Sequence, residues 1–146
     1  AGLSWELVLR KRATTVHAFE NFNVDTVAAY GERSMTRLLA DPGIIRNKLK
    51  VESIIENAKR IKTLRDSHNG FANWIAAHHP LNRQEWTKLF RNTFKFMGSE
   101  IVNEFLMCTG YLPGSHSVDC ATYKHIAKLN PPWMQVNVNI FKNSGL

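Results

Sequence analysis

A long amphipathic stretch between residues 46 and 64 constrains the fold more than any other feature of the chain. Its apolar residues recur every three or four positions, which is the spacing of one helix face: Val51, Ile54, Ile55, Ala58 and Ile61. The opposite face is charged, and Asn69-Gly70 is a helix-ending pair. Because the alternating pattern of half-buried strands is scarce elsewhere, we predict an all-α protein.

The same helical spacing recurs in shorter segments on both sides of this helix. We predict further helices over 4–12, 14–21, 24–30, 34–40, 71–77, 83–91 and 99–109. The pattern changes after Lys128, where Asn130-Pro131-Pro132-Trp133 interrupts helical structure and 136–141 alternates like a strand without a partner. We therefore expect a helical domain over 1–128. The remaining segment, 129–146, is expected to be a poorly ordered tail or an arm that packs through Trp133.

The composition indicates a single domain that binds a polyanion. The chain has 146 residues, with 19 Lys and Arg against 12 Asp and Glu, and the net charge of +7 favours nucleic acid as a partner. No run of roughly 18 apolar residues occurs, so we expect no association with a membrane. The two cysteines, Cys108 and Cys120, indicate a reduced, cytoplasmic setting better than a disulfide framework.

The first twelve residues, AGLSWELVLRKR, combine small residues, Leu3 and Trp5 with a basic helical pattern. A protein that flips a nucleotide out of a duplex needs an apolar wedge to fill the gap and an aromatic surface to stack on the extruded base. Leu3 and Trp5 are the two residue types that such a site requires. An N-terminal helix that buries Leu3, Trp5 and Leu9 in a core would explain the same residues.

A turn at Asp41-Pro42-Gly43 separates two helical patterns, and we expect Gly43 to adopt a positive φ there. The arrangement is typical of a helix–hairpin–helix, in which the second helix begins with free N–H groups that can bind one phosphate. Arg46, Lys48 and Lys50 add positive charge nearby. An ordinary helical hairpin whose Ile44 and Ile45 fill the core is equally consistent with the pattern.

A third motif, His116-x3-Cys120, places two zinc-ligand types four positions apart. Such a pair can reach one Zn²⁺, but a tetrahedral site needs four ligands. Cys108 and His125 are the nearest other candidates, and we do not expect them to complete a site.

Three segments, 1–12, 38–61 and 94–120, together resemble the DNA-3-methyladenine glycosylase I family in sequence and in order. The resemblance implies an all-α, helix–hairpin–helix DNA glycosylase-like bundle. It also implies a monofunctional hydrolase that removes 3-methyladenine from alkylated double-stranded DNA by base flipping, as a step of base-excision repair. A monomer is expected.

The resemblance assigns roles to individual residues. Trp5 would stack on the damaged base, and Gly2 and Leu3 would lie at the gap left in the DNA. Phosphate contacts are expected from the turn and the start of the following helix: Gly43, Ile45, Arg46 and Lys48. His116 and Cys120 would be half of a four-ligand structural zinc site.

The remaining functional groups of the family come from a segment before the first match. The base-contacting carboxylate and the other two zinc ligands lie there, so we expect an N-terminal part to be missing. We therefore assign no secure catalytic residue within this chain and expect zinc to be incompletely held or absent. Glu6 is not assigned the role, because helical spacing directs it away from Trp5.

Two other functions fit the residues. The first is a non-catalytic helix–hairpin–helix module that binds DNA without acting on it. The second, more distant, is a helical protein-interaction domain whose positive charge serves solubility alone.

Overall fold

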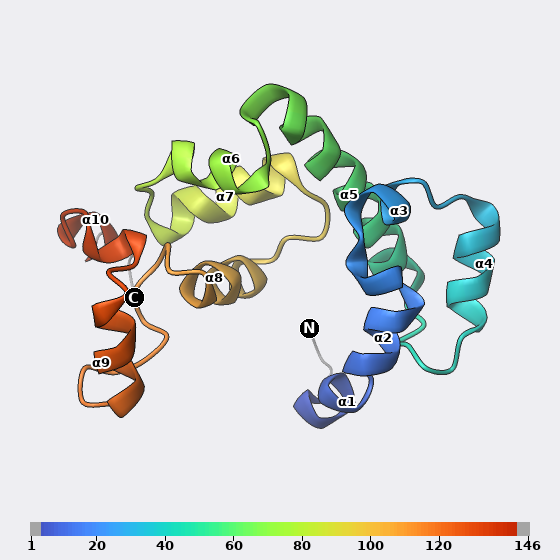
Figure 1. The fold of residues 1–146 in the computed structure, drawn as a ribbon, viewed down its shortest axis with the longest axis horizontal. Helices are drawn as coiled ribbons and strands as arrows, with labels where there is room; N and C mark the ends of the chain where they lie inside the picture. The colour runs from blue at the N-terminus through green and yellow to red at the C-terminus, as the bar shows by residue number, and fades with distance from the viewer. Residues whose placement is uncertain (1–3, 143–146) are drawn as a thin grey trace. The chain divides into compact units, whose positions relative to one another are not determined.

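The computed structural model describes residues 4–142, and every regular element in that range is helical. The prediction of an all-α protein is confirmed. The chain divides into two compact units, residues 1–71 and 72–146 (Figure 1). This division does not coincide with the boundary that we expected at residue 128.

The first unit is built on the long helix α5 (Lys48–His68). Shorter elements precede it: α1 (Trp5–Arg10), α2 (Arg12–Ala18), a 3-10 turn (Glu20–Phe22), α3 (Val24–Ala28) and α4 (Glu32–Ala40). The apolar face predicted from the spacing is directed inward, since Val51, Ile55 and Ala58 are buried. They share a core with residues of the preceding helices and connections, including Phe19, Val27, Leu38 and Ile44.

Helix α5 differs from the predicted range at both ends. It begins at Lys48 because the side chain of Asn47 accepts a hydrogen bond from the N–H of Lys50 at 3.1 Å, which caps the helix. It continues beyond Leu64 to His68 and ends where Asn69 takes a left-handed φ of 54°. The Asn69-Gly70 pair therefore ends the helix, as the sequence predicts.

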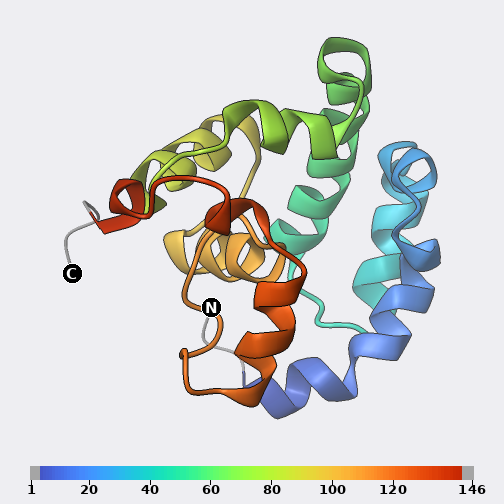
Figure 2. The same ribbon diagram turned by 60° about the vertical axis from the view of Figure 1, so that its left-hand side comes forward.

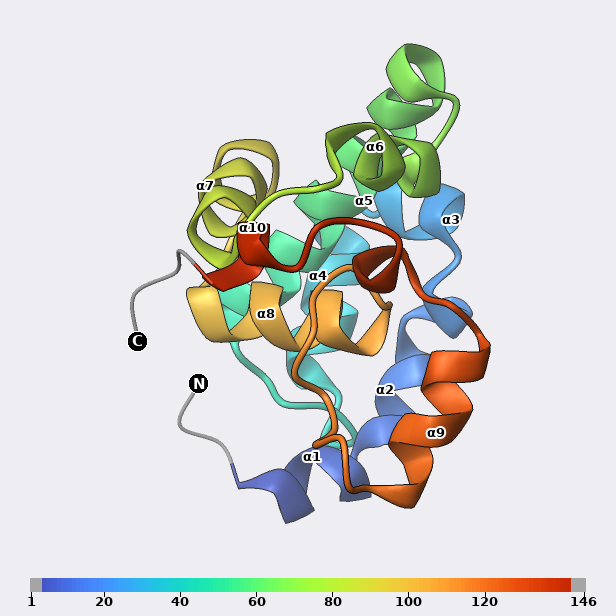
Figure 3. The same ribbon diagram turned by 90° about the vertical axis from the view of Figure 1, so that its left-hand side faces the viewer.

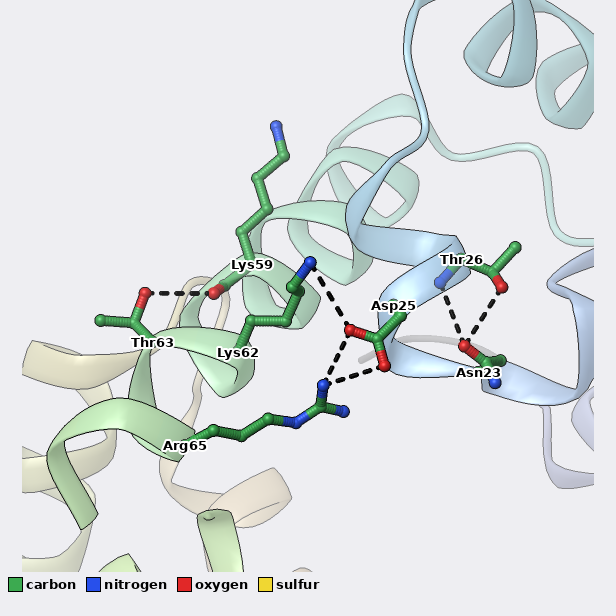
Figure 4. A network of polar contacts seen from close by, with 7 residues as sticks. All are labelled: Asn23, Asp25, Thr26, Lys59, Lys62, Thr63 and Arg65. Carbon is green, nitrogen blue, oxygen red and sulfur yellow. Dashed lines mark hydrogen bonds and ion pairs between the residues drawn. The ribbon is translucent and has the colours of Figure 1, made fainter. Parts of the chain in front are cut away.

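An ion-pair network joins α3 to α5 near the end of the long helix. Arg65 donates hydrogen bonds to both carboxylate oxygens of Asp25, at 2.7 and 2.9 Å, and Lys62 lies 3.5 Å from the same group (Figure 4). The hydrogen bond from Arg65 lowers the pKa of Asp25 below its usual value. All three side chains are about half exposed, so solvent screens the pair.

The second unit has an aromatic core. Its helices are α6 (Phe71–His78, which begins at the unit boundary), α7 (Arg83–Thr93), α8 (Ser99–Cys108), α9 (Ala121–Lys128) and α10 (Asn139–Lys142). The ring of Trp74 meets those of Phe90 and Phe94 edge-on, with centroids 5.4 and 5.5 Å away. Trp86 is fully buried beside Phe90. These rings pack α6, α7 and the following connection together.

The segment after α9 is structured through residue 142, and two sequence expectations for it are wrong. Pro132–Met134 forms a 3-10 turn, with proline at the helix start where its missing N–H has no cost, and Asn139–Lys142 is helical instead of strand-like. Figure 3 shows this segment turning back past the end of α8. There the N–H of Trp133 donates to the carbonyl of Gly110 at 3.1 Å. The alternative expectation, an arm that packs through Trp133, fits this contact.

The lengths and hydropathies of the described helices bear on whether they could span a membrane. None of them is both long and apolar enough to cross a bilayer.

Candidate nucleic-acid interface

Trp5 stands at the start of α1 with its side chain in solvent. The Ser4 hydroxyl accepts a hydrogen bond from the N–H of Leu7 at 3.2 Å and so caps this helix. Trp5 is 74% exposed and Leu9 is 49% exposed, so the alternative in which both residues fill a core is wrong. Gly2 and Leu3 lie outside the described residues. An exposed indole is available for stacking on a ligand.

The segment 41–47 connects α4 to α5 and differs from the expected tight turn. Figure 2 shows it as a teal connection between the two helices. Gly43 does not have a positive φ, and its backbone N–H donates to the Asp41 carboxylate at 2.7 Å. The glycine is required for space instead: a Cβ there would lie 2.9 Å from Asp41 Oδ1 and 3.2 Å from Thr14 Cβ. The positive φ that we expected at Gly43 is therefore wrong.

The side chains after Gly43 divide between the core and the surface. Ile44 is 3% exposed and belongs to the core, as the alternative interpretation of this segment predicts, whereas Ile45 is half-buried. Arg46 and Lys48 are exposed. Lys48 lies 3.8 Å from Glu52 one turn along α5, in a weak exposed pair. Two cations thus flank the N-terminal end of a 21-residue helix, where the helix dipole also favours an anion.

A second basic surface, which our sequence analysis missed, lies on α7. A groove of about 520 Å³ is lined by Arg83, Gln84, Thr87, Lys88, Arg91, Asn92 and Ser99. Two of its guanidinium groups have partners: Arg83 donates to Glu100 at 2.9 Å and Arg91 donates to the carbonyl of Met97 at 3.1 Å. The signal was present in the sequence, because Gln84, Lys88 and Arg91 recur at helical spacing on the side away from the buried Trp86 and Phe90.

Helices α7 and α8 also form a more compact helical pair than α4 and α5 do. Their connection, 94–98, is shorter than the connection 41–47, and Phe96 within it has a φ of 61°. Asn82 and Glu85 form a reciprocal capping box at the start of α7. The groove described above therefore rests on a well-defined pair of helices.

The structure brings His116 and Cys120 together, with Nδ1 and Sγ 3.6 Å apart. Cys120 precedes α9, and a hydrogen bond from the backbone N–H of Thr122 lowers the pKa of its thiol. Within residues 4–142, no group of three or more His, Cys, Asp or Glu side chains is placed to hold a metal ion. The described residues therefore supply two donors for a zinc ion and do not fit a complete tetrahedral site.

Comparison with known proteins shows the family to which this chain belongs. The sequence pattern of the methyladenine glycosylase family matches residues 1–88. The chain is 32% identical over 142 residues to DNA-3-methyladenine glycosylase 1 of Escherichia coli, an alignment that covers 84% of this chain and 75% of the relative. The chain belongs to the methyladenine glycosylase family.

Other relatives agree with this assignment. The chain is also 27% identical over 139 residues to the DNA-3-methyladenine glycosylase of Haemophilus influenzae, covering 82% of the chain and 75% of that protein. A crystal structure of 3-methyladenine DNA glycosylase I superposes with a TM-score of 0.70 at 27% identity, covering 82% of this chain and 76% of that one. The enzyme from Staphylococcus aureus superposes with a TM-score of 0.69 at 25% identity, covering 84% and 74%. The fold implied by the resemblance is thereby confirmed.

Proposed function

We propose that this methyladenine glycosylase removes 3-methyladenine from DNA by hydrolysing the N-glycosidic bond. The observation that carries the proposal is the exposed indole of Trp5, which lies within the family match at the start of α1. A solved relative, a variant of 3-methyladenine DNA glycosylase I, was crystallised in complex with 3-methyladenine. Its TM-score to this chain is 0.70 at 25% identity.

The chemistry of the base explains why one aromatic ring can contribute strongly to binding 3-methyladenine. Methylation at N3 gives adenine a positive charge, and the electron-rich face of an indole attracts a cation in addition to stacking on it. When the bond between the base and C1′ breaks, its electron pair neutralises the base. Water then adds to C1′ and releases a proton to solvent, leaving an abasic site. Because the base leaves as a neutral molecule, the reaction needs no acid to protonate it.

We propose two surfaces for the DNA backbone. The first is the end of the 41–47 segment, where Arg46 and Lys48 are exposed beside the start of α5. The second is the groove on α7, where Lys88 and Arg91 face solvent. Such contacts position a duplex without reading its sequence.

A structural zinc ion would have His116 and Cys120 as its two ligands in the described chain. Zinc in such a site stabilises a fold and takes no part in the reaction. We propose that the described residues alone do not hold it tightly.

The decisive experiment is a base-release assay on methylated duplex DNA. Trp5→Ala should lower affinity for the damaged base by about 1–3 kcal/mol, the usual size of one stacking contact. Release should fall accordingly, while binding to undamaged duplex should change little. Glu6→Gln is the matched control, because Glu6 is an exposed neighbour on the same helix.

Each outcome of this assay has a distinct meaning. Duplex binding by the parent protein without any release of base would mean that this chain acts as a non-catalytic DNA-binding module, as expected if the base-contacting carboxylate lies outside residues 1–146. Equal release by the parent and Trp5→Ala would remove Trp5 from the base site. A loss in Glu6→Gln as large as that in Trp5→Ala would show that α1 as a whole, or Glu6 itself, is responsible.

A further inference from the structure

Two side chains at the start of α2 reach across the first unit to the turn at 42–43. The hydroxyl of Thr14 lies 2.6 Å from the carbonyl oxygen of Gly43, and the ammonium of Lys11 lies 2.5 Å from that of Pro42. These partners are 29 and 31 positions apart in the sequence. We call this pair of hydrogen bonds the Lys11–Thr14 contact.

The Thr14 hydroxyl has two carbonyl neighbours and only one proton. It lies 3.1 Å from the carbonyl of Lys11 in its own helix and 2.6 Å from that of Gly43. The shorter distance identifies Gly43 as its principal acceptor. A local helix contact of the kind that threonine ordinarily makes is therefore secondary here.

The turn that receives these hydrogen bonds is also held from its other sides. The carboxylate of Asp41 accepts the N–H of Gly43 at 2.7 Å, and Ile44 is buried in the core. A methyl group at Gly43 would lie only 2.9 Å from Asp41 Oδ1 and 3.2 Å from Thr14 Cβ. The Lys11–Thr14 contact thus completes a turn with little freedom to shift.

The contact joins the two parts of the proposed site that lie in this unit. Lys11 directly follows α1, whose first residue is Trp5, and Arg46 and Lys48 follow the turn. We propose that Thr14 is a positioning residue: through Gly43 it sets the spacing between the Trp5 platform and the phosphate-binding segment. Lys11 supports Thr14 by donating a second hydrogen bond to the same turn, at the carbonyl of Pro42. The Lys11 ammonium is therefore engaged with this carbonyl. The inference rests on the proposed function.

The expected effect of losing the contact is on reaction rate and not on duplex affinity. The cations of the two proposed DNA-backbone surfaces would all remain, so undamaged DNA should still bind. A duplex held by its phosphates would then present the damaged base to Trp5 at a variable distance. Misplacement of reacting groups by about 1 Å can cost up to 100-fold in rate.

The test compares Thr14→Val, Thr14→Ser and the control Thr63→Val with the parent protein. Valine keeps the shape of threonine and removes the donor, whereas serine keeps the donor. Thr63 is an exposed residue of α5 whose hydroxyl bonds only locally, to the carbonyl of Lys59 at 3.3 Å (Figure 4). Three quantities are measured: amide hydrogen exchange over 41–47, single-turnover base release at saturating protein, and affinity for undamaged duplex at several salt concentrations.

Thr14→Val should exchange faster over 41–47 and release base about tenfold more slowly, within the range that misplacement allows. Its affinity for undamaged duplex and its salt slope should match the parent, and Thr14→Ser and Thr63→Val should behave as the parent does. Parent-like release by Thr14→Val would overturn the proposal. So would an equal loss in Thr14→Ser, or a loss of duplex affinity that accounts for the slower release.

A parent protein that releases no base would count against catalysis by this chain and not against this inference. The same variants would then be compared by their preference for a duplex with an abasic-site analogue over an undamaged duplex. Loss of that preference in Thr14→Val alone would support the positioning role. An unchanged preference would overturn it.

Discussion

The size of one side chain decides the conformation of the turn at Gly43. The two atoms that a Cβ would meet are a carboxylate oxygen of Asp41, already engaged with the backbone of this turn, and Cβ of Thr14 in α2. Neither can move away without breaking a hydrogen bond that holds the segment. Glycine is therefore needed at this position because there is no room for a side chain. The turn does not need a backbone conformation that only glycine adopts easily.

Gly43→Ser should lower the free energy of unfolding by about 1–3 kcal/mol, the usual cost of forcing extra atoms into a packed site. Gly31→Ser is the matched control. A Cβ at Gly31 meets nothing within 4 Å, and serine is a favoured residue at the start of a helix such as α4. Urea unfolding of the two variants measures the difference. Equal midpoints would show that the turn can relax around a side chain.

Among the elements of the first unit, α3 and α5 make the most extensive contact. Their apolar contact, with Val27 and Val51 both buried, is supplemented at one end by the ion pairs of Asp25 with Arg65 and Lys62. An exposed network of this kind contributes little to stability at neutral pH. Its contribution can be recognised by its dependence on pH.

The pKa of Asp25 is lowered in the folded protein, chiefly by the hydrogen bond from Arg65. A carboxyl group with a lowered pKa stabilises the fold at pH values above its ordinary pKa of 3.8, and the stabilisation is lost as the pH falls through the folded value. Asp25→Asn should therefore unfold at slightly lower urea than the parent at pH 7, and the gap should close in acid. Asp66→Asn, which changes an exposed carboxylate on α5 next to Arg65, is the control. A gap that persists unchanged into strong acid would contradict this account.

At the scale of the whole molecule, each of the two units carries one of the basic surfaces proposed to contact DNA. One lies at Arg46 and Lys48 in the first unit, and the other lies along the α7 groove in the second. The net charge of +7 makes attraction to a duplex strong at low salt, but it does not show which cations touch phosphates. Salt dependence separates these cations from the rest.

Removing one cation that contacts a phosphate should lower the slope of log affinity against log salt by about one unit. We predict this change for Lys48→Ala and for Lys88→Ala, and a change of about two units for the double variant. Lys59→Ala, an exposed cation about three turns along α5 from Lys48, should leave the slope unchanged. The measurement is duplex affinity at several salt concentrations. A double variant no different from one single variant would mean that only one of the two surfaces contacts DNA.

The sequence by itself determined the helices, many of their ends and the family. Helix periodicity and capping depend on residues within one or two turns of each other, so a short segment of sequence is enough to predict them. The face of α5 with Val51, Ile55 and Ala58 and its stop at Asn69-Gly70 are of this kind.

Only the tertiary structure decided the exposure of Trp5, the reason for Gly43 and the Lys11–Thr14 contact. Each depends on residues far apart in sequence, such as Thr14 and Gly43, whose approach is set by the path of the connection 41–47. A turn motif such as Asp41-Pro42-Gly43 allows several backbone paths of similar local energy. Packing selects one of them, because Ile44 must enter the core while Gly43 remains close enough to Thr14 for a hydrogen bond.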